Sequence, residues 1–258
     1  MKITVTHFGT ATLLLEIGSL RLLTDPVFDA PGHRYHVLGL AGYRKRSARI
    51  VSELPPLDAV LLSHDHHGDN LDTSGLAIAR QASCILTTTA GARRLGGNAE
   101  GLFPWQERVL HGQDGFTLRV TATPAQHGPR WMNPITGPVI GFVLEWEGQT
   151  HGALYITGDT VLFPGLDAVG QRWRIGTLFP HAGRASFLSM RSLHYTLTAT
   201  ETAELVQRLS PHACYPIHYE GWSHFAEGRN DIHAACAAIE VDDRMHWLPI
   251  GQKVEIET

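Results

Sequence analysis

The chain has 258 residues, of which 43% are hydrophobic and 18% charged, and this composition is typical of folded globular proteins and excludes global disorder. Its formal net charge of −4 gives no general attraction to nucleic acid or to an anionic membrane, so neither is expected as a partner. No apolar run approaches the roughly 20 residues that span a bilayer, and the first residues lack the features of a signal peptide.

The cysteines indicate the cellular location of the protein, and the uniform composition along the chain indicates the number of domains. Cys84, Cys214 and Cys236 are far apart and odd in number, so they form neither a disulfide framework nor a CxxC pair. These isolated thiols favour a reducing, cytoplasmic location. No repeat, linker or shift in composition divides the chain, and we expect one domain over residues 1–258.

In chain order, the pattern predicts an α/β protein in which strands alternate with a few helices. Strands are expected over 3–5, 11–17, 20–24, 59–62, 85–88, 116–123, 139–146, 152–156 and 213–217, with another before His181, and helices over 74–80, 90–95, 198–209 and 230–239. The segment 28–54 is rich in Gly and Pro, and we expect a long functional loop there with some helix.

The stretch "LLSHDHHGDN" (61–70) follows a predicted buried strand and crowds three histidines and two aspartates together. Such crowding is costly unless a partner such as a divalent cation compensates the polar groups. His64 and His66 can converge from a tight turn after the strand, with Asp69 one turn further and Gly68 supplying unusual backbone angles. The alternative is a polar surface loop that happens to be rich in histidine.

Three later segments share one design, an apolar strand with a single ligand-type residue at its end. They deliver His127, Asp159 and His218. Side chains at several strand ends of an α/β fold converge on one edge of the sheets, where sites are commonly built. Taken one by one, each residue is explained by an ordinary turn, but together with 61–70 they predict a metal site.

The ordered set of motifs resembles the metallo-β-lactamase superfamily, and within it the branch of ascorbate-6-phosphate lactonase-like and N-acylphosphatidylethanolamine phospholipase D-like hydrolases. The resemblance rests on "GTATLLLEIGSLRLLTDPVF" (9–28), "SHDHHGDNLD" (63–72), "YITGDT" (155–160) and "PIHYEGW" (216–222), and it covers nearly the whole chain. It implies a four-layer αβ/βα sandwich, with two mixed β-sheets packed face to face, and hydrolysis by a metal-bound hydroxide.

The resemblance also implies roles for single residues. His64, His66 and His127 match the ligands of a first metal, Asp159 matches the bridging carboxylate and His218 a histidine of a second metal. Asp25 in "LTDP" matches a carboxylate that orients ligands from behind. We expect one or two Zn²⁺ ions.

One departure from the family pattern HxHxDH concerns the second metal. With one inserted residue, Asp69 takes the place of the family aspartate and orients the nucleophile, and Asn70 falls where a histidine is expected, behind the ligands. An ungapped match would place Gly68 and Asp69 there instead. Either way the second site loses a nitrogen ligand, which favours Mn²⁺ there. His67 is a candidate replacement ligand, although a surface role is favoured.

The remaining expectations concern the substrate. His181, Trp222 and His224 are candidates to line the pocket, against the simpler alternatives of a turn histidine and a packed loop. The basic run 44–46 could close over an anionic substrate, although a solvated loop is the more common outcome. We expect hydrolysis of a small ester, lactone or phosphodiester. The alternatives are a metal-binding protein with little catalysis, a nuclease, and a diiron oxidoreductase, which in the resembling family carries Glu at the position of His66.

Overall fold

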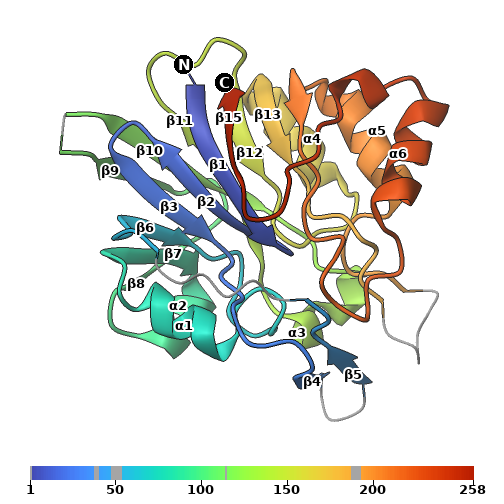
Figure 1. The fold of residues 1–258 in the computed structure, drawn as a ribbon, viewed down its shortest axis with the longest axis horizontal. Coiled ribbons are helices and arrows are strands. Elements are labelled where there is room, and N and C mark those ends of the chain that lie inside the picture. Colours follow the sequence, from blue (N-terminus) through green and yellow to red (C-terminus); the bar gives the residue numbers. More distant parts are fainter. Residues whose placement is uncertain (1, 38–40, 48–53, 114, 187–192) are drawn as a thin grey trace.

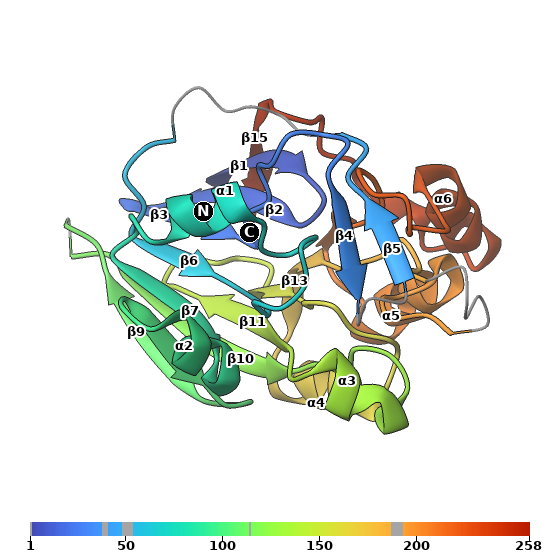
Figure 2. The same ribbon diagram turned by 90° about the horizontal axis from the view of Figure 1, so that it is seen from below.

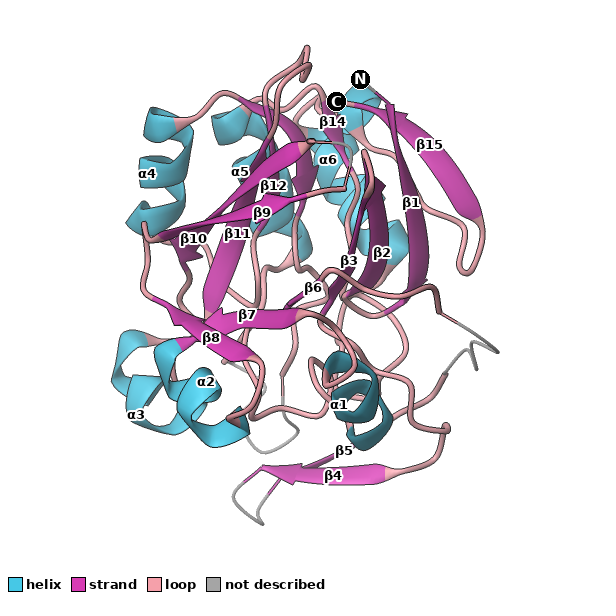
Figure 3. Cartoon of the chain, turned by 90° about the vertical axis from the view of Figure 1, so that its left-hand side faces the viewer, coloured by secondary structure: helices cyan, strands magenta, loops and turns pink. Residues whose placement is uncertain are grey.

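Two β-sheets pack face to face, and helices cover their outer faces, as the computed structural model of the chain shows (Figures 1 and 3). The structure describes residues 2–37, 41–47, 54–113, 115–186 and 193–258. The seven-stranded sheet has the order β15-β1-β2-β3-β6-β7-β8, and the six-stranded sheet has the order β14-β13-β12-β11-β10-β9. Each sheet mixes parallel and antiparallel pairs, in agreement with the predicted four-layer α/β sandwich.

The strands of the two sheets are short and lie close to the predicted ranges. Those of the first sheet are β1 (Lys2–Gly9), β2 (Thr12–Ile17), β3 (Leu20–Thr24), β6 (Ala59–Leu61), β7 (Cys84–Thr88), β8 (Ala99–Leu102) and β15 (Lys253–Glu257). Those of the second are β9 (Glu107–His111), β10 (Thr117–Pro124), β11 (Ile140–Glu145), β12 (Ala153–Ile156), β13 (Ile175–Phe179) and β14 (Ala213–Cys214).

The helices divide between the two outer faces. They are α1 (Thr73–Ala79), α2 (Thr89–Leu95), α3 (Asn133–Thr136), α4 (Pro164–Arg172), α5 (Ala199–Leu209) and α6 (Arg229–Ala238). Apolar residues of α4, α5 and α6 share one buried cluster with the outer face of the six-stranded sheet, whereas α1 packs on the seven-stranded sheet. Within the described residues, no helix combines the length and the apolar character that crossing a membrane would require.

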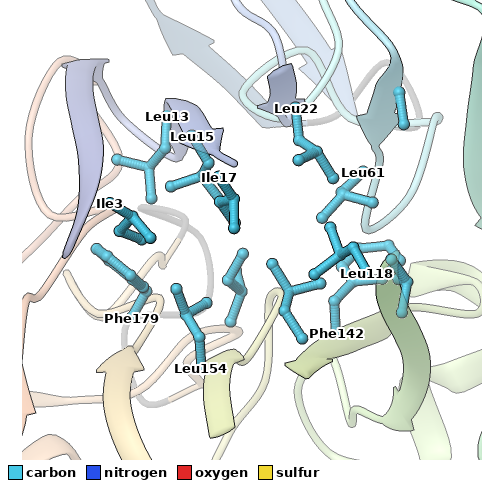
Figure 4. Close-up of a cluster of buried hydrophobic side chains, with 14 of the residues drawn as sticks. Ile3, Leu13, Leu15, Ile17, Leu22, Leu61, Leu118, Phe142, Leu154 and Phe179 are labelled. Carbon is cyan, nitrogen blue, oxygen red and sulfur yellow. The ribbon is translucent and has the colours of Figure 1, made fainter. Parts of the chain in front are cut away.

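The central core lies between the sheets and follows from the period-two alternation of the strands. In β2, Leu13, Leu15 and Ile17 enter the space between the sheets (Figure 4), while Leu14 belongs to the cluster on the outer side. In β11, Phe142 points inward and Val143 faces the helices. Strands buried on both faces read as nearly continuous apolar runs, which is why the sequence locates them well.

The segment 28–54 contains a β-hairpin where some helix was expected. Strands β4 (Arg34–Val37) and β5 (Ala41–Arg44) pair antiparallel, with Tyr35 opposite Tyr43. Residues 38–40 and 48–53, also part of the expected loop, lie outside the described residues. Figure 2 looks onto the end of the molecule where this hairpin and α3 lie, beyond the ends of the strands.

The start of β11 is a position where even one added methyl group is expected to destabilise the fold. A Cβ on Gly141 would lie 2.5 Å from Thr123 Oγ1, 2.5 Å from the Thr157 carbonyl oxygen and 2.6 Å from the Ile156 carbonyl oxygen. Because two of these atoms are backbone, we expect Gly141→Ala to lower the free energy of unfolding by about 3 kcal/mol, measured by urea denaturation. Gly228→Ala is the control, since open space surrounds Gly228, and it should cost less than about 1 kcal/mol; equal costs would contradict the prediction.

Candidate metal centre

Six strand ends deliver polar side chains to one edge of the two sheets. The residues are Asp25 after β3, the loop 63–70 after β6, His127 after β10, Asp159 after β12, His181 after β13 and His218 after β14. Their atoms form three sets that could each hold a metal ion, with every ligand atom of a set within 4.8 Å of the others: His64, His66 and His67; His64, His127 and Asp159; Asp69, Asp159 and His218. The sequence therefore located the edge at which these groups meet.

One side of the cluster consists of imidazole nitrogens. His67 Nδ1 lies 3.0 Å from His64 Nε2 and 3.1 Å from His127 Nε2. The Nδ1 of His127 donates a hydrogen bond to the Tyr195 carbonyl at 2.8 Å, so its Nε2 carries the lone pair when the ring is neutral. Nitrogen ligands of one tetrahedral zinc ion stand roughly 3.3 Å apart. The spacing of these nitrogens therefore suits a shared cation.

His66 has a ligand atom within 4.8 Å of those of His64 and His67, near where the sequence suggested, but one of its ring nitrogens is bound elsewhere. Its Nε2 donates to the Thr136 carbonyl oxygen at 2.5 Å, whereas half-buried His67, for which a surface role was favoured, packs against His64 and His127. With the inserted residue placed between His64 and His67, the run His67-Gly68-Asp69-Asn70 falls into the HxDH register. The sequence alone could not separate this placement from an insertion after His66.

The other side of the cluster is formed by carboxylates and one histidine. His218 Nε2 lies 3.4 Å from Asp159 Oδ1 and 3.6 Å from Asp69 Oδ2. Asp159 Oδ2 lies 4.0 Å from His64 Nε2, so this carboxylate faces both halves of the cluster. Asn70 Nδ2 is 3.4 Å from Asp159 Oδ1, close to the second group of ligand atoms, where the family pattern has a histidine. The geometry suits two adjacent cations that share Asp159.

Several buried atoms of the cluster have no hydrogen-bond partner within the described residues. They are Asp159 Oδ2, Asn70 Oδ1, His66 Nδ1, His181 Nε2 and both ring nitrogens of His218. Buried polar atoms are almost always paired, so a group of them in one place points to a missing ligand. Lone pairs of imidazole and carboxylate suit zinc and similar divalent metals. The residues present therefore fit the metal that the motifs imply.

The pKa values separate neutral imidazoles on one side of the cluster from ionised carboxylates on the other, with His218 as the exception. Burial alone would lower the pKa of His218, but the carboxylates of Asp159 and Asp69 raise it to about 9. Burial, together with the neighbouring His127, lowers the pKa of His67 to about 3, and burial also lowers the pKa of His64 and of His127. Burial alone would raise the pKa of Asp159, but the surrounding histidines, above all His218, more than offset it and hold that pKa below its usual range. Neutral histidines beside ionised carboxylates are the protonation states that ligate a cation.

Asp25 and His181 stand behind the ligands. His181 is fully buried, and its Nδ1 donates to Asp159 Oδ1 at 2.8 Å, so it holds the shared carboxylate rather than facing a pocket. Asp25 Oδ1 accepts the Ser63 backbone N–H at 2.7 Å, which fixes the turn that carries His64. Burial raises the pKa of Asp25 to about 8. This position agrees with the orienting role that the sequence suggested for Asp25, whereas the substrate contact suggested for His181 does not fit its burial.

Backbone strain gathers at the same edge. Thr10, Asp25 and His218 have φ angles of 54°, 31° and 61°, a region that residues other than glycine rarely adopt. The Thr10 carbonyl accepts the backbone N–H of His218 at 2.6 Å, and this contact helps to hold His218 in its unusual conformation. Strained backbone of this kind is typical of functional sites.

Two of the residues suggested as pocket lining instead support the cluster. The Nε2 of His224 donates to Asp69 Oδ2 at 2.9 Å. Trp222 is only 2% exposed, and its indole N–H donates to Thr10 Oγ1 at 3.0 Å. Both therefore pack behind Asp69 and the loop of His218, which matches the simpler alternative given for Trp222.

The hairpin β4–β5 holds the metal loop from outside. The Gly68 backbone N–H donates to the hydroxyl of Tyr43 at 3.0 Å, and a Cβ on Gly68 would lie 2.3 Å from the Tyr35 ring. In the basic run 44–46, Lys45 is buried and pairs with Asp72 at 2.8 Å. Lys45 therefore has a structural partner and does not reach toward a substrate.

Comparisons with known proteins agree with this site. The family model described as "Beta-lactamase superfamily domain" matches residues 20–219. The chain is 27% identical over 248 residues to a UPF0173 metal-dependent hydrolase of Pelotomaculum thermopropionicum, covering 91% of this chain and 93% of that protein. It is 28% identical over 224 residues to a protein of the same name from Deinococcus radiodurans, covering 83% of each chain.

A solved structure shares the fold over almost the full length. An isothiocyanate hydrolase from Delia radicum gut bacteria superposes with a TM-score of 0.79 at 20% identity, covering 98% of this chain and 99% of the other. The motifs, the layered fold and the matched model lead to one assignment. The chain belongs to the metallo-β-lactamase superfamily, and it is a metal-dependent hydrolase of that family.

Proposed function

We propose that this chain hydrolyses a small ester, lactone or phosphodiester with the help of one or two Zn²⁺ ions. The observation that carries the proposal is the meeting of His64, His67 and His127 nitrogens on one side of Asp159 with Asp69 and His218 on the other. Two adjacent cation sites that share a carboxylate are suited to hydrolytic chemistry.

The short distances from His67 to His64 and His127 support the proposed ligand sets. His64, His67 and His127 hold the first cation, and Asp159 lies between the two. Asp69 and His218 hold the second, where the amide of Asn70 replaces a nitrogen ligand. This second site is rich in oxygen, so it binds zinc less tightly and accepts Mn²⁺.

The chain's own side chains account for the rest of the chemistry. Bound divalent cations would supply Lewis acidity and would lower the pKa of a coordinated water toward 7, roughly nine units below its bulk value. Asp69 orients the attacking water and receives its proton as a general base. His224 donates to Asp69 Oδ2 and keeps that carboxylate in place. Asp25 and His181 hold the Ser63 turn and Asp159 in position.

The proposal also covers the domain organisation, the cellular location and the partners of the enzyme. Strands β1 and β15 flank the matched range and pair with each other in the same sheet, which supports a single domain over residues 1–258. All three cysteines are buried and free, which supports a reducing, cytoplasmic location. The expected partner is a small-molecule substrate, and we do not expect nucleic acid.

Reconstitution with defined metals tests the function. Protein stripped of metal is loaded with Zn²⁺ or Mn²⁺, its metal content is measured by mass spectrometry, and turnover is followed on an alkyl ester, a lactone, a phosphodiester and an isothiocyanate. We expect turnover of at least one of the first three substrates that rises with one to two equivalents of metal and is lost on chelation. Turnover that survives chelation would contradict the proposal.

Asp69→Asn is the control for genuine catalysis, and it should abolish turnover by the loaded protein. The loss of a nitrogen ligand at Asn70 motivates one alternative, a metal-binding protein with little catalytic activity. Stoichiometric metal with no turnover of any ester, lactone or phosphodiester would favour that alternative over a hydrolase of these substrates.

A further inference from the structure

An apolar cavity adjoins the metal cluster. It has a volume of about 530 Å³, within the range of small-molecule sites. Its walls come from the start of α2, the end of β8, the segment after β10 and the segment from α3 to β11. His127 lines this cavity and also belongs to the metal cluster, so the cavity lies directly beside one of the proposed ligands.

The chemistry of the walls is predominantly apolar. Among the described residues that line the cavity, Leu102, Phe103, Pro104, Ala125, Pro134, Pro138, Val139 and Ile140 carry apolar side chains, and none is Asp, Glu, Lys or Arg. Such walls offer no charge to attract an anionic group, and they favour burial of hydrocarbon.

Exposed apolar side chains gather at the same place. Phe103 on the cavity wall is 61% exposed, and Trp131 and Ile135, on the segment that leads into α3 and on α3 itself, are 66% and 46% exposed. Ile239 on the far side, at the end of α6, is the fourth large apolar residue found exposed within the described chain. Clustered exposed apolar groups beside a cavity are typical of ligand-binding grooves.

His66 connects this wall to the metal loop. Its Nε2 donates to the carbonyl of Thr136, and a Cβ on Gly137 would lie 2.7 Å from the same nitrogen. Gly137 lines the cavity. His66, which the insertion leaves outside the HxDH register, therefore binds the end of α3 and lies against the cavity wall at Gly137.

We propose that this cavity is the subsite for the hydrocarbon part of the substrate, an acyl or alkyl chain, and that His66 is the positioning residue that holds its wall. This inference rests on the proposed hydrolase function and names its substrate class. A second cavity, of about 650 Å³, lies at the opposite end of the strands around Trp146, Arg172 and Arg174, and no residue of the metal cluster lines it. It therefore offers no alternative place for a chain attached to the reacting group.

Binding of carboxylates of different chain length to the metal-loaded protein tests the inference by calorimetry. We expect octanoate to bind at least about fiftyfold more tightly than acetate. Each buried methylene strengthens binding by about fourfold, and three buried methylenes are enough for this difference. Asn133→Trp places a large side chain in the cavity from an exposed position, and it should remove most of that preference while acetate affinity and metal content stay unchanged.

The role of His66 is tested in the same assay. His66→Ala should reduce the preference for octanoate about tenfold with metal content retained, and His66→Gln, which keeps a donor for Thr136, should recover part of it. Ile239→Ala is the matched control for loss of an exposed apolar side chain, and it should change nothing. Equal affinity for octanoate and acetate would overturn the subsite.

The two proposals can fail separately. If no ester is hydrolysed but octanoate still binds in preference to acetate and Asn133→Trp blocks it, the subsite stands and the hydrolase proposal falls. If esters are hydrolysed with kcat/KM independent of chain length and octanoate shows no preference, the hydrolase proposal stands and the subsite is wrong.

Discussion

His67→Ala is expected to release about one equivalent of metal and to lower kcat/KM by about a thousandfold, whereas His66→Ala keeps its metal. The reason is that His67 Nδ1 lies within 3.1 Å of both His64 Nε2 and His127 Nε2, while His66 turns its Nε2 to a backbone carbonyl. A metal contributes several kcal/mol to the stabilisation of the transition state, and about 4 kcal/mol corresponds to a thousandfold.

The measurement is metal content after gel filtration, together with kinetics on the best substrate of the panel. The double variant His64→Ala/His127→Ala should lose the same metal completely. His233→Ala, an exposed histidine on α6, controls for nonspecific loss of imidazole. If His66→Ala loses metal and His67→Ala does not, the ligand assignment is reversed and the insertion follows His66.

Asp72→Ala is expected to lower the free energy of unfolding by about 4 kcal/mol or more. Asp72 Oδ2 accepts from Lys45 Nζ at 2.8 Å, and both side chains are almost completely buried. Removing one partner leaves an uncompensated buried charge, which costs about 3–5 kcal/mol. Asp72 Oδ1 also caps α1 by accepting the Gly75 N–H at 2.8 Å, which contributes about 1 kcal/mol more.

Urea denaturation measures this cost. Glu107→Ala breaks the exposed pair with Arg119 and should cost at most about 1 kcal/mol. Lys45→Met/Asp72→Asn removes both charges and keeps a capping oxygen, so it should be more stable than Asp72→Ala. A loss of less than about 1 kcal/mol in Asp72→Ala would show that water or another group compensates Lys45.

The sequence predicted most of the architecture because its strands are buried and its main helices carry clear start signals. Helix α5 begins at a capping box formed by Thr198 and Glu201, in which the Glu201 N–H donates to Thr198 Oγ1 at 3.1 Å. Helix α4 was not predicted, since Gly165 and Gly170 weaken its helical pattern. Pro164 at its first turn was the signal that could have located it. Strands β8 and β9 were also missed, because each is short and only partly buried.

The sequence located the edge of the site but not the contacts within it. Distances between residues such as His224 and Asp69 depend on how distant loops fold together, and no local pattern specifies them. The roles of His66 and His67 differ by one position of an insertion, and both placements satisfy the same spacing rule. Phe103 and the α3 segment border a cavity that only packing creates, so no local pattern connects them with His127.

The contact between the β4–β5 hairpin and Gly68 couples metal binding to the order of the hairpin, so that each stabilises the other. Gly68 sits between His67 and Asp69, one from each half of the cluster, and the hydroxyl of Tyr43 receives its backbone N–H. Metal binding that fixes His67 and Asp69 also stabilises the hairpin. An ordered hairpin in turn holds His67 and Asp69 in place for the metal. The Tyr43 side chain, twenty-five residues upstream of Gly68, would therefore contribute to metal affinity without contacting the ion.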